Sequence, residues 1–137
     1  MCKKNVCILA LAFYIAFVYW ITVFSRDAYP QAGSDWRIFW TYGAIADGRD
    51  ELIVEVIFNL LMFLPIGLIV GLVVRYGGWL VAFFSGAALS LGIEMLQLHL
   101  KRGLCETDDI IHNTLGCLIG FALIRILGVI YRKQGII

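Results

Sequence analysis

Four long apolar runs, separated by shorter polar stretches, divide the chain. They cover residues 5–24, 51–74, 78–98 and 109–130. A helix of about 20 apolar residues is long enough to cross the hydrocarbon core of a bilayer. We therefore expect an all-α integral membrane protein, in which a compact bundle of four transmembrane helices forms a single domain over residues 1–137.

The first apolar run is preceded by Lys3 and Lys4 and contains no charged residue. A secretory signal peptide has a shorter apolar core, followed by a cleavage site of small residues. Because no site of the A-x-A type follows, we expect residues 5–24 to be retained as a membrane-spanning helix.

The longest polar stretch, residues 25–50, is also rich in aromatic residues. Ser34 is suited to cap a short helix that begins at the next residue. Trp36, Phe39 and Trp40 would then share one face of that helix, which is typical of a segment lying in the lipid head-group layer. An irregular loop, anchored at the membrane interface by the same aromatic residues, explains the pattern equally well.

The composition agrees with a membrane protein and disfavours other classes. Of the 137 residues, 61% are hydrophobic and 15% are charged, whereas a soluble domain carries about a quarter charged residues. The net charge is +1 and no basic cluster contains interleaved aromatic residues, so we expect no nucleic-acid partner. The four cysteines lack CxxC spacing, which favours buried free thiols over a metal or redox site. No metal and no cofactor is expected.

The charges also predict an orientation. Four spans place both termini on one side of the membrane, together with Lys3, Lys4, Arg75, Arg132 and Lys133. The positive-inside rule makes that side cytoplasmic, although the number of basic residues alone barely decides, because the opposite side carries Arg26, Arg37, Arg49, Lys101 and Arg102. All ten acidic residues then lie on the opposite face or in the helical turns next to it.

Polar residues near the ends of the last three runs are the candidate functional residues. An acid or amide within a lipid-length segment is costly, so each one is a functional-site hypothesis. Helical geometry places these residues within a few turns of the same membrane face. We expect a site near the outer leaflet, lined by Glu55, Asn59, Glu94, Gln97, Asp109 and Asn113. Arg102 would lie above this site as a cation, and His112 would have a secondary role.

Glycines at four-residue spacing predict where the helices pack closely. Such small residues let the backbones of neighbouring helices approach each other. The contacts could join helices within one chain or build a homo-oligomer. The glycines concerned are Gly67 and Gly71 in the second run, Gly86 in the third, and Gly116 and Gly120 in the fourth.

Two spaced patterns between Asn59 and Gly120 resemble the signatures of the VanZ-like membrane protein family. The first, N-x3-F-x-P-x-G, is met by Asn59, Phe63, Pro65 and Gly67. The second, E-x2-Q, then R, then D-x3-N-x2-G-x3-G, is met by Glu94, Gln97, Arg102, Asp109, Asn113, Gly116 and Gly120. The resemblance implies a four-helix protein of the bacterial cytoplasmic membrane. The family's named member is associated with low-level resistance to the glycopeptide teicoplanin.

Three hypotheses of function remain open at this point. In the first, the protein binds an amphiphile at the outer leaflet or alters access to it, for example a lipid-linked cell-wall precursor or a lipoglycopeptide. Arg102 or Lys101 would then meet a phosphate or carboxylate. In the second, an intramembrane enzyme modifies such a head group, with Glu94 as acid or base supported by Asp109 and His112. No motif places a nucleophile for this enzyme.

The third hypothesis is structural. Glu94 would pair with Arg102, and Asp109 with His112, so that the polar residues only fix how the helices pack. A metal site built from His99 together with Glu94, Asp109 and His112 lacks the spacing of an HExxH motif and is not favoured.

Overall fold

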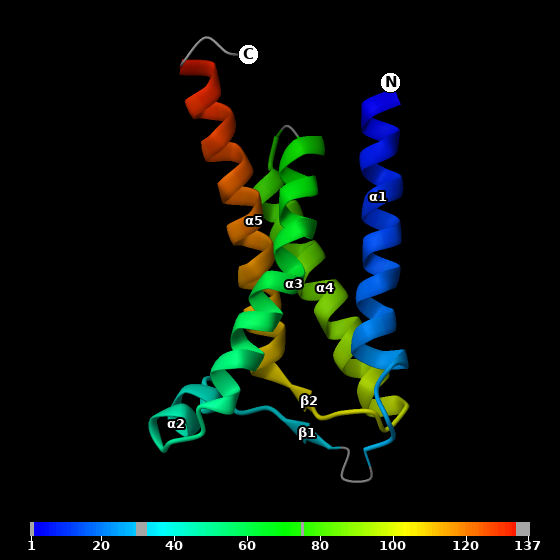
Figure 1. Ribbon diagram of the computed structural model, residues 1–137, viewed down its shortest axis with the longest axis vertical. Helices are drawn as coiled ribbons and strands as arrows, with labels where there is room; N and C mark the ends of the chain where they lie inside the picture. Colours follow the sequence, from blue (N-terminus) through cyan, green and yellow to red (C-terminus); the bar gives the residue numbers. More distant parts are fainter. Residues whose placement is uncertain (1, 30–32, 75, 134–137) are drawn as a thin grey trace.

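Four long helices build the protein, shown in Figure 1. The structure is a computed structural model and describes residues 2–29, 33–74 and 76–133. Within these ranges, four helices are long and apolar enough to cross a membrane. The predicted all-α transmembrane bundle is therefore confirmed. These helices are α1 (Cys2–Tyr19), which continues into the π-helical turn η1 (Trp20–Phe24), α3 (Glu51–Val73), α4 (Gly78–His99) and α5 (Thr107–Lys133).

The ends of α3 and α4 match the predicted spans to within one residue and the first helix begins three residues earlier than predicted, whereas α5 is longer at both ends. That helix begins at Thr107 and extends to Lys133, beyond the predicted run of 109–130. Asp108 and Asp109 lie in its first turn, where negative charge is favoured by the helix dipole. Apolarity alone assigned Asp108 to the connector, although the backbone accommodates it as helix.

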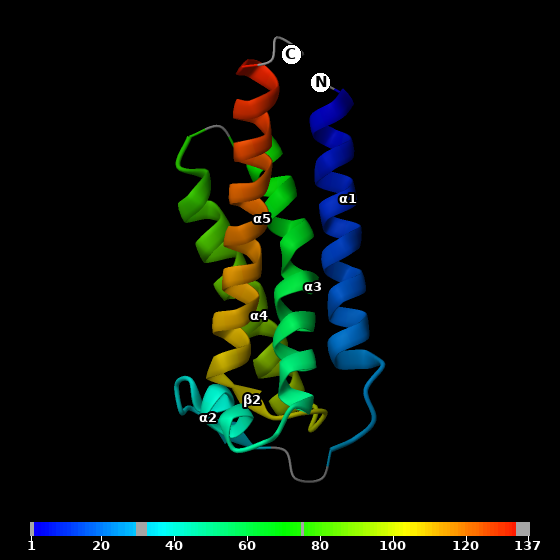
Figure 2. The same ribbon diagram turned by 60° about the vertical axis from the view of Figure 1, so that its left-hand side comes forward.

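The two ends of the bundle differ in structure. The first turns of α1 and the last turns of α5 lie together at one end (Figures 1 and 2). The short elements lie at the other, which we call the cavity end. The predicted orientation depends on the basic residues of one end. Among these, Arg75 and the side chains of Lys3, Lys4, Arg132 and Lys133 lie outside the described residues. The orientation therefore stays a prediction.

Two short strands and one short helix cover the cavity end. Strand β1 (Ser34–Asp35) pairs in parallel with β2 (Cys105–Glu106). The expectation that Ser34 caps a helix beginning at Asp35 is wrong, because both residues are extended and α2 spans Trp40–Ala46. The Ser34 hydroxyl instead accepts a hydrogen bond of 3.0 Å from the indole Nε1 of Trp36. Pairing with a strand far along the sequence thus overrides the local capping signal.

The backbones of α3 and α5 touch at glycines. A Cβ atom added to Gly67 would overlap the carbonyl oxygen of Cys117 in α5. In the opposite direction, a Cβ at Gly116 or Gly120 would overlap a carbonyl oxygen of α3, that of Leu60 or Leu64 respectively. Any side chain at these three positions would separate the helices, and the backbone contact therefore requires glycine.

The remaining helices pack around this pair. A Cβ at Gly86 of α4 would lie 3.1 Å from the Cα of Thr114 and 3.0 Å from the Cβ of Cys117, and one at Gly71 would meet Ile124. Two tyrosines of α1 hold it to its neighbours: Tyr14 donates a hydrogen bond of 2.9 Å to the Met62 carbonyl, and Tyr19 one of 3.0 Å to the Leu89 carbonyl. The core includes Val18, Val23, Phe63, Ile66, Val70, Ala82, Ile93 and Cys117.

We expect Gly116→Ala to destabilise the bundle, because its methyl group would meet the Leu60 carbonyl. Overpacking of this kind costs about 1–3 kcal/mol. Gly128→Ala is the matched control on the same helix, where an added Cβ has nothing within 4 Å. The thermal midpoint in detergent should fall for the first variant and stay level or rise for the second. Equal midpoints would contradict the backbone contact.

Candidate functional site

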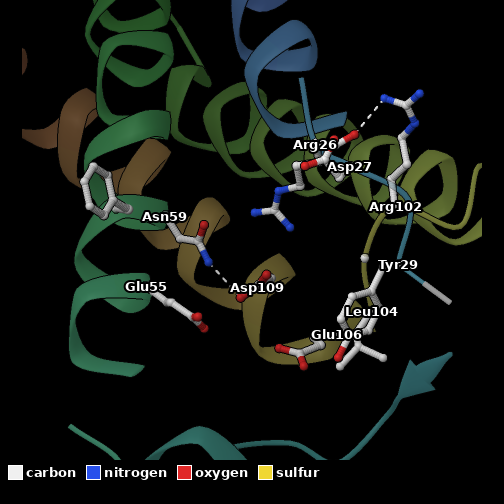
Figure 3. A pocket seen from close by; sticks show the side chains of 11 residues that line it. Arg26, Asp27, Tyr29, Glu55, Asn59, Arg102, Leu104, Glu106 and Asp109 are labelled. Atoms are coloured by element: carbon white, nitrogen blue, oxygen red, sulfur yellow. Dashed lines mark hydrogen bonds between the residues drawn. The ribbon is translucent and has the colours of Figure 1, made fainter. Parts of the chain in front are cut away.

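A cavity of about 490 Å³ opens at the cavity end of the bundle, and Figure 3 shows the side chains around it. Segments far apart in the sequence meet there: the chain after η1, the first turns of α3, the connector between α4 and α5, and the first turn of α5. Its lining consists of Arg26, Asp27, Tyr29, Glu55, Phe58, Asn59, Arg102, Gly103, Leu104, Glu106 and Asp109.

One hydrogen bond joins α3 to α5 across the cavity. The side-chain amide of Asn59 donates to Asp109 Oδ1 at 2.7 Å (Figure 3). Asn59 lies two turns into α3 and Asp109 in the first turn of α5. Four of the predicted site residues line the cavity: Glu55, Asn59, Arg102 and Asp109.

Three carboxyl groups, those of Glu55, Glu106 and Asp109, face the cavity from three different elements (Figure 3). Each interacts electrostatically with the other two. Burial raises the pKa of Glu106 to about 7, and repulsion from Asp109 and Glu55 adds to this rise, with smaller contributions from Asp35 and Asp108. A carboxyl with a raised pKa, facing other carboxyls in a cavity, is typical of functional sites.

The two arginines at the cavity have different roles. The guanidinium of Arg26 points into the cavity (Figure 3), and its charge interacts with the carboxyls of Asp109 and Glu94. Nη1 of Arg102 donates instead to backbone carbonyls, at 2.6 Å to Phe24 and 2.8 Å to Arg26. Carbonyls at the end of a helix lack intrahelical partners. Arg102 therefore fixes the end of the first span, and Arg26 supplies the cation that the sequence assigned to Arg102.

The other predicted site residues lie outside the cavity lining and connect elements. Glu94 accepts the backbone N–H of Glu106 at 2.9 Å and so positions β2. Gln97 donates to the Thr22 carbonyl at 2.9 Å, and Asn113 donates to the Ser90 hydroxyl at 2.8 Å. Their side chains are buried in the bundle.

Two predicted ion pairs are wrong. Arg102 bonds to carbonyl groups rather than to Glu94. The carboxylate of Asp109 bonds to Asn59, whereas His112 is hydrogen-bonded at 3.0 Å to the hydroxyl of Tyr42. Asp109 and His112 lie three residues apart in α5, but spacing along a helix carries no information on which partner each side chain meets.

Comparison with known proteins identifies the family of the chain. A family model described as VanZ/LLP1 matches residues 11–128. The chain belongs to the VanZ/LLP1 family. The match confirms the resemblance seen in the two signatures and extends it into the first span and the 25–50 stretch. No curated protein and no solved structure gives a significant match.

The VanZ/LLP1 signature residues can now be related to contacts. Gly67, Gly116 and Gly120 form the contact between α3 and α5. Most of the polar positions tie two elements together: Asn59 with Asp109, Glu94 with Glu106, Gln97 with Thr22, Arg102 with Phe24 and Arg26, and Asn113 with Ser90. Much of the pattern therefore describes how the cavity is built.

Several cavity residues of this VanZ/LLP1 chain were not predicted as site residues. They are Arg26, Asp27, Tyr29, Phe58, Gly103, Leu104 and Glu106. Arg26 and Asp27 could have been predicted, because they follow the end of the first span. They therefore lie at the same membrane face as Glu55 and Asp109, which are near the starts of the second and fourth spans. For Glu106, the signal would have been a strand pairing that spans about seventy residues.

We expect the stability of the protein to fall as the pH rises from 5 to 8. The pKa of Glu106 is about 7 in the folded protein, against an ordinary value of 4.5. The folded state therefore holds a proton that the unfolded state releases, and its stabilising effect is complete below pH 4.5 and lost as the pH passes 7. The difference corresponds to roughly 3 kcal/mol at most.

Glu106→Gln should remove this part of the pH dependence and raise the thermal midpoint at pH 8 more than at pH 5. Glu51→Gln is the control, because that carboxyl is exposed and pairs with Arg49 away from the cavity. Thermal unfolding in detergent at both pH values measures the effect. A Glu106→Gln variant with the wild-type pH slope would show that Glu106 does not titrate in this range.

Proposed function

We propose that this VanZ/LLP1 protein binds the polar head group of an envelope amphiphile in the cavity. The main support for this proposal is the mixture of charged and apolar side chains that line the cavity. Glu55, Glu106 and Asp109 lie beside Phe58 and Tyr29, which are 67% and 40% exposed. A ligand that combines a charged head with an acyl tail meets both kinds of surface.

The proposal includes a position in the cell. The predicted charge pattern places both termini in the cytoplasm of a bacterium, so that the cavity end faces the outer leaflet of the cytoplasmic membrane. An amphiphile in that leaflet would reach the cavity without crossing the bilayer. Candidate ligands of this kind are a lipid-linked cell-wall precursor and a lipoglycopeptide.

The charge of the cavity favours a cationic head group. Four carboxylic acids and two arginines line it, and one of these arginines, Arg102, has Nη1 engaged by backbone carbonyls. A primary ammonium has three donors, which matches the three carboxyls of Glu55, Glu106 and Asp109. Charge-assisted hydrogen bonds of this type are among the stronger polar contacts. An ammonium therefore suits the cavity better than the phosphate or carboxylate expected from the sequence.

Binding of this kind would contribute to resistance by limiting the access of the antibiotic to the wall precursor. A protein that holds a wall precursor or a lipoglycopeptide at the outer leaflet changes how much of either is free to meet the other. Low-level protection against teicoplanin follows from such a change without any covalent step. The buried Glu94, whose carboxylate is held by the Glu106 backbone, contributes to the shape of the cavity in this scheme.

We expect the purified protein in lipid nanodiscs to bind dodecylammonium more tightly than dodecyl phosphate, which has the same tail. The difference should be roughly tenfold, or about 1.4 kcal/mol. It should increase as the pH passes 7 and Glu106 loses its proton. Glu55→Gln combined with Asp109→Asn should abolish the preference, and Glu51→Gln should keep it. Equal binding of both probes, or tighter binding of the phosphate, would contradict a cationic head group.

In a susceptible Gram-positive host, we expect Glu55→Gln and Asp109→Asn to reach wild-type abundance in the membrane but to lose protection against teicoplanin. Both changes keep the side-chain shape and remove only the charge. Gly116→Leu should lower abundance and protection together, because it separates α3 from α5. Full protection by well-expressed Glu55→Gln and Asp109→Asn would show that the cavity charge is not needed for resistance.

A further inference from the structure

An exposed apolar surface lies beside the cavity end, on residues 36–42. Trp36 is 56% exposed, Ile38 63%, Phe39 58% and Tyr42 48%. These residues include the first turn of α2 and the chain that leads into it. We call them the 36–42 segment. A patch of large apolar side chains next to a polar cavity marks a contact with another phase or molecule.

The 36–42 segment is fixed to α5 mainly by Asp108, a residue that the predicted site did not include. The carboxylate of Asp108, which is 1% exposed, accepts the backbone N–H of Phe39 at 2.6 Å and that of Thr41 at 2.9 Å. It thus satisfies free donors at the start of α2, as a capping side chain does. Phe39 has a left-handed backbone (φ 63°), which turns the chain into α2 at this point.

Further contacts hold the same segment from its other sides. The Tyr42 hydroxyl bonds to Nε2 of the buried His112 at 3.0 Å. The guanidinium groups of Arg37 and Arg49 lie 5.4 Å and 5.5 Å from the ring centre of Trp40. The exposed apolar side chains are therefore presented by a backbone that is bonded to the bundle.

The depth of the 36–42 segment along the bundle axis indicates which surface its exposed side chains contact. Only residues 47–50 separate α2 from the start of α3, and Asp108 is the second residue of α5. The segment therefore lies where two spans begin, which is the boundary between hydrocarbon and lipid head groups. In the first turn of the adjoining α3, the apolar side chain of Val54 is exposed as well, at 53%. Tryptophan and tyrosine are enriched at this depth.

We propose that the 36–42 segment inserts Trp36, Ile38 and Phe39 into the head-group layer of the bilayer that the four helices cross. The partner is a lipid surface. Because Asp108 joins the segment to the first turn of α5, and the next residue, Asp109, lines the cavity, the bilayer surface holds the cavity end of α5 in place. The mouth of the cavity is thereby kept at the depth of the lipid head groups.

Tryptophan fluorescence tests this placement. The chain has four tryptophans, and replacing Trp20, Trp40 and Trp79 by phenylalanine leaves Trp36 as the only reporter. The protein is placed in phosphatidylcholine vesicles whose acyl chains are brominated close to the head group. We expect these lipids to quench Trp36 about as well as they quench a variant that keeps only Trp20, which is 62% exposed on the first span. Aqueous iodide should quench Trp36 weakly.

Two results would overturn the proposal. Strong quenching by iodide without quenching by bromolipid would place the segment in water. Weak quenching by both would show that protein covers it, for example a second copy of the chain.

A second variant keeps the test decisive if the tryptophan changes disturb folding. Ile38→Asp adds a charge on a side chain that is 63% exposed and outside the core, so folding should be unaffected. Introduced into the chain that keeps all four tryptophans, it should reduce the overall quenching by bromolipid and increase the overall quenching by iodide. Ala28→Asp, at an exposed position outside the 36–42 segment, is the matched control and should leave both values unchanged. If Ile38→Asp also left both unchanged, the side chain at position 38 would not be in lipid.

Discussion

The contact between the backbones of α3 and α5 sets the geometry of the bundle and of its cavity. Helices in lipid gain little from apolar burial, so close packing and polar contacts have to hold them together. Gly67, Gly116 and Gly120 allow the two backbones to touch. That approach brings Asn59 within 2.7 Å of Asp109, and the hydrogen bond forms one wall of the cavity. With any larger residue at these glycines, the wall would open.

A second set of ties closes the cavity from the side of the first span. Backbone carbonyls near a membrane need partners, because lipid offers none. The side chains of Arg102 and Gln97 supply donors to the carbonyls of Thr22, Phe24 and Arg26. These bonds bring the chain after η1 next to the connector between α4 and α5. Arg26 then points into the cavity as a consequence of where its own backbone is held.

Polar residues in this bundle therefore fall into two groups. Those that are fully buried, such as Glu94, Gln97 and Asn113, bond to a neighbouring element and fix its position. Those at the cavity, such as Glu55 and Glu106, are left facing an open space and one another. The first group explains why the structure tolerates costly polar groups within spans. The second group gives the cavity an acidic character, on which the proposed preference for a cationic head group depends.

The four spans, the helical class and the family can be derived from the sequence, because length, apolarity and glycine spacing are local properties of the chain. The sequence also predicts that the polar residues lie at one level, since helical rise sets their depth. Which of them line the cavity depends on the packing of the helices. Asp108 caps a helix 67 residues away, β1 pairs with a strand about seventy residues later, and Arg26 takes the place expected for Arg102. Each of these outcomes depends on how helices rotate and connectors fold against one another, and no local pattern encodes which partner a side chain will meet.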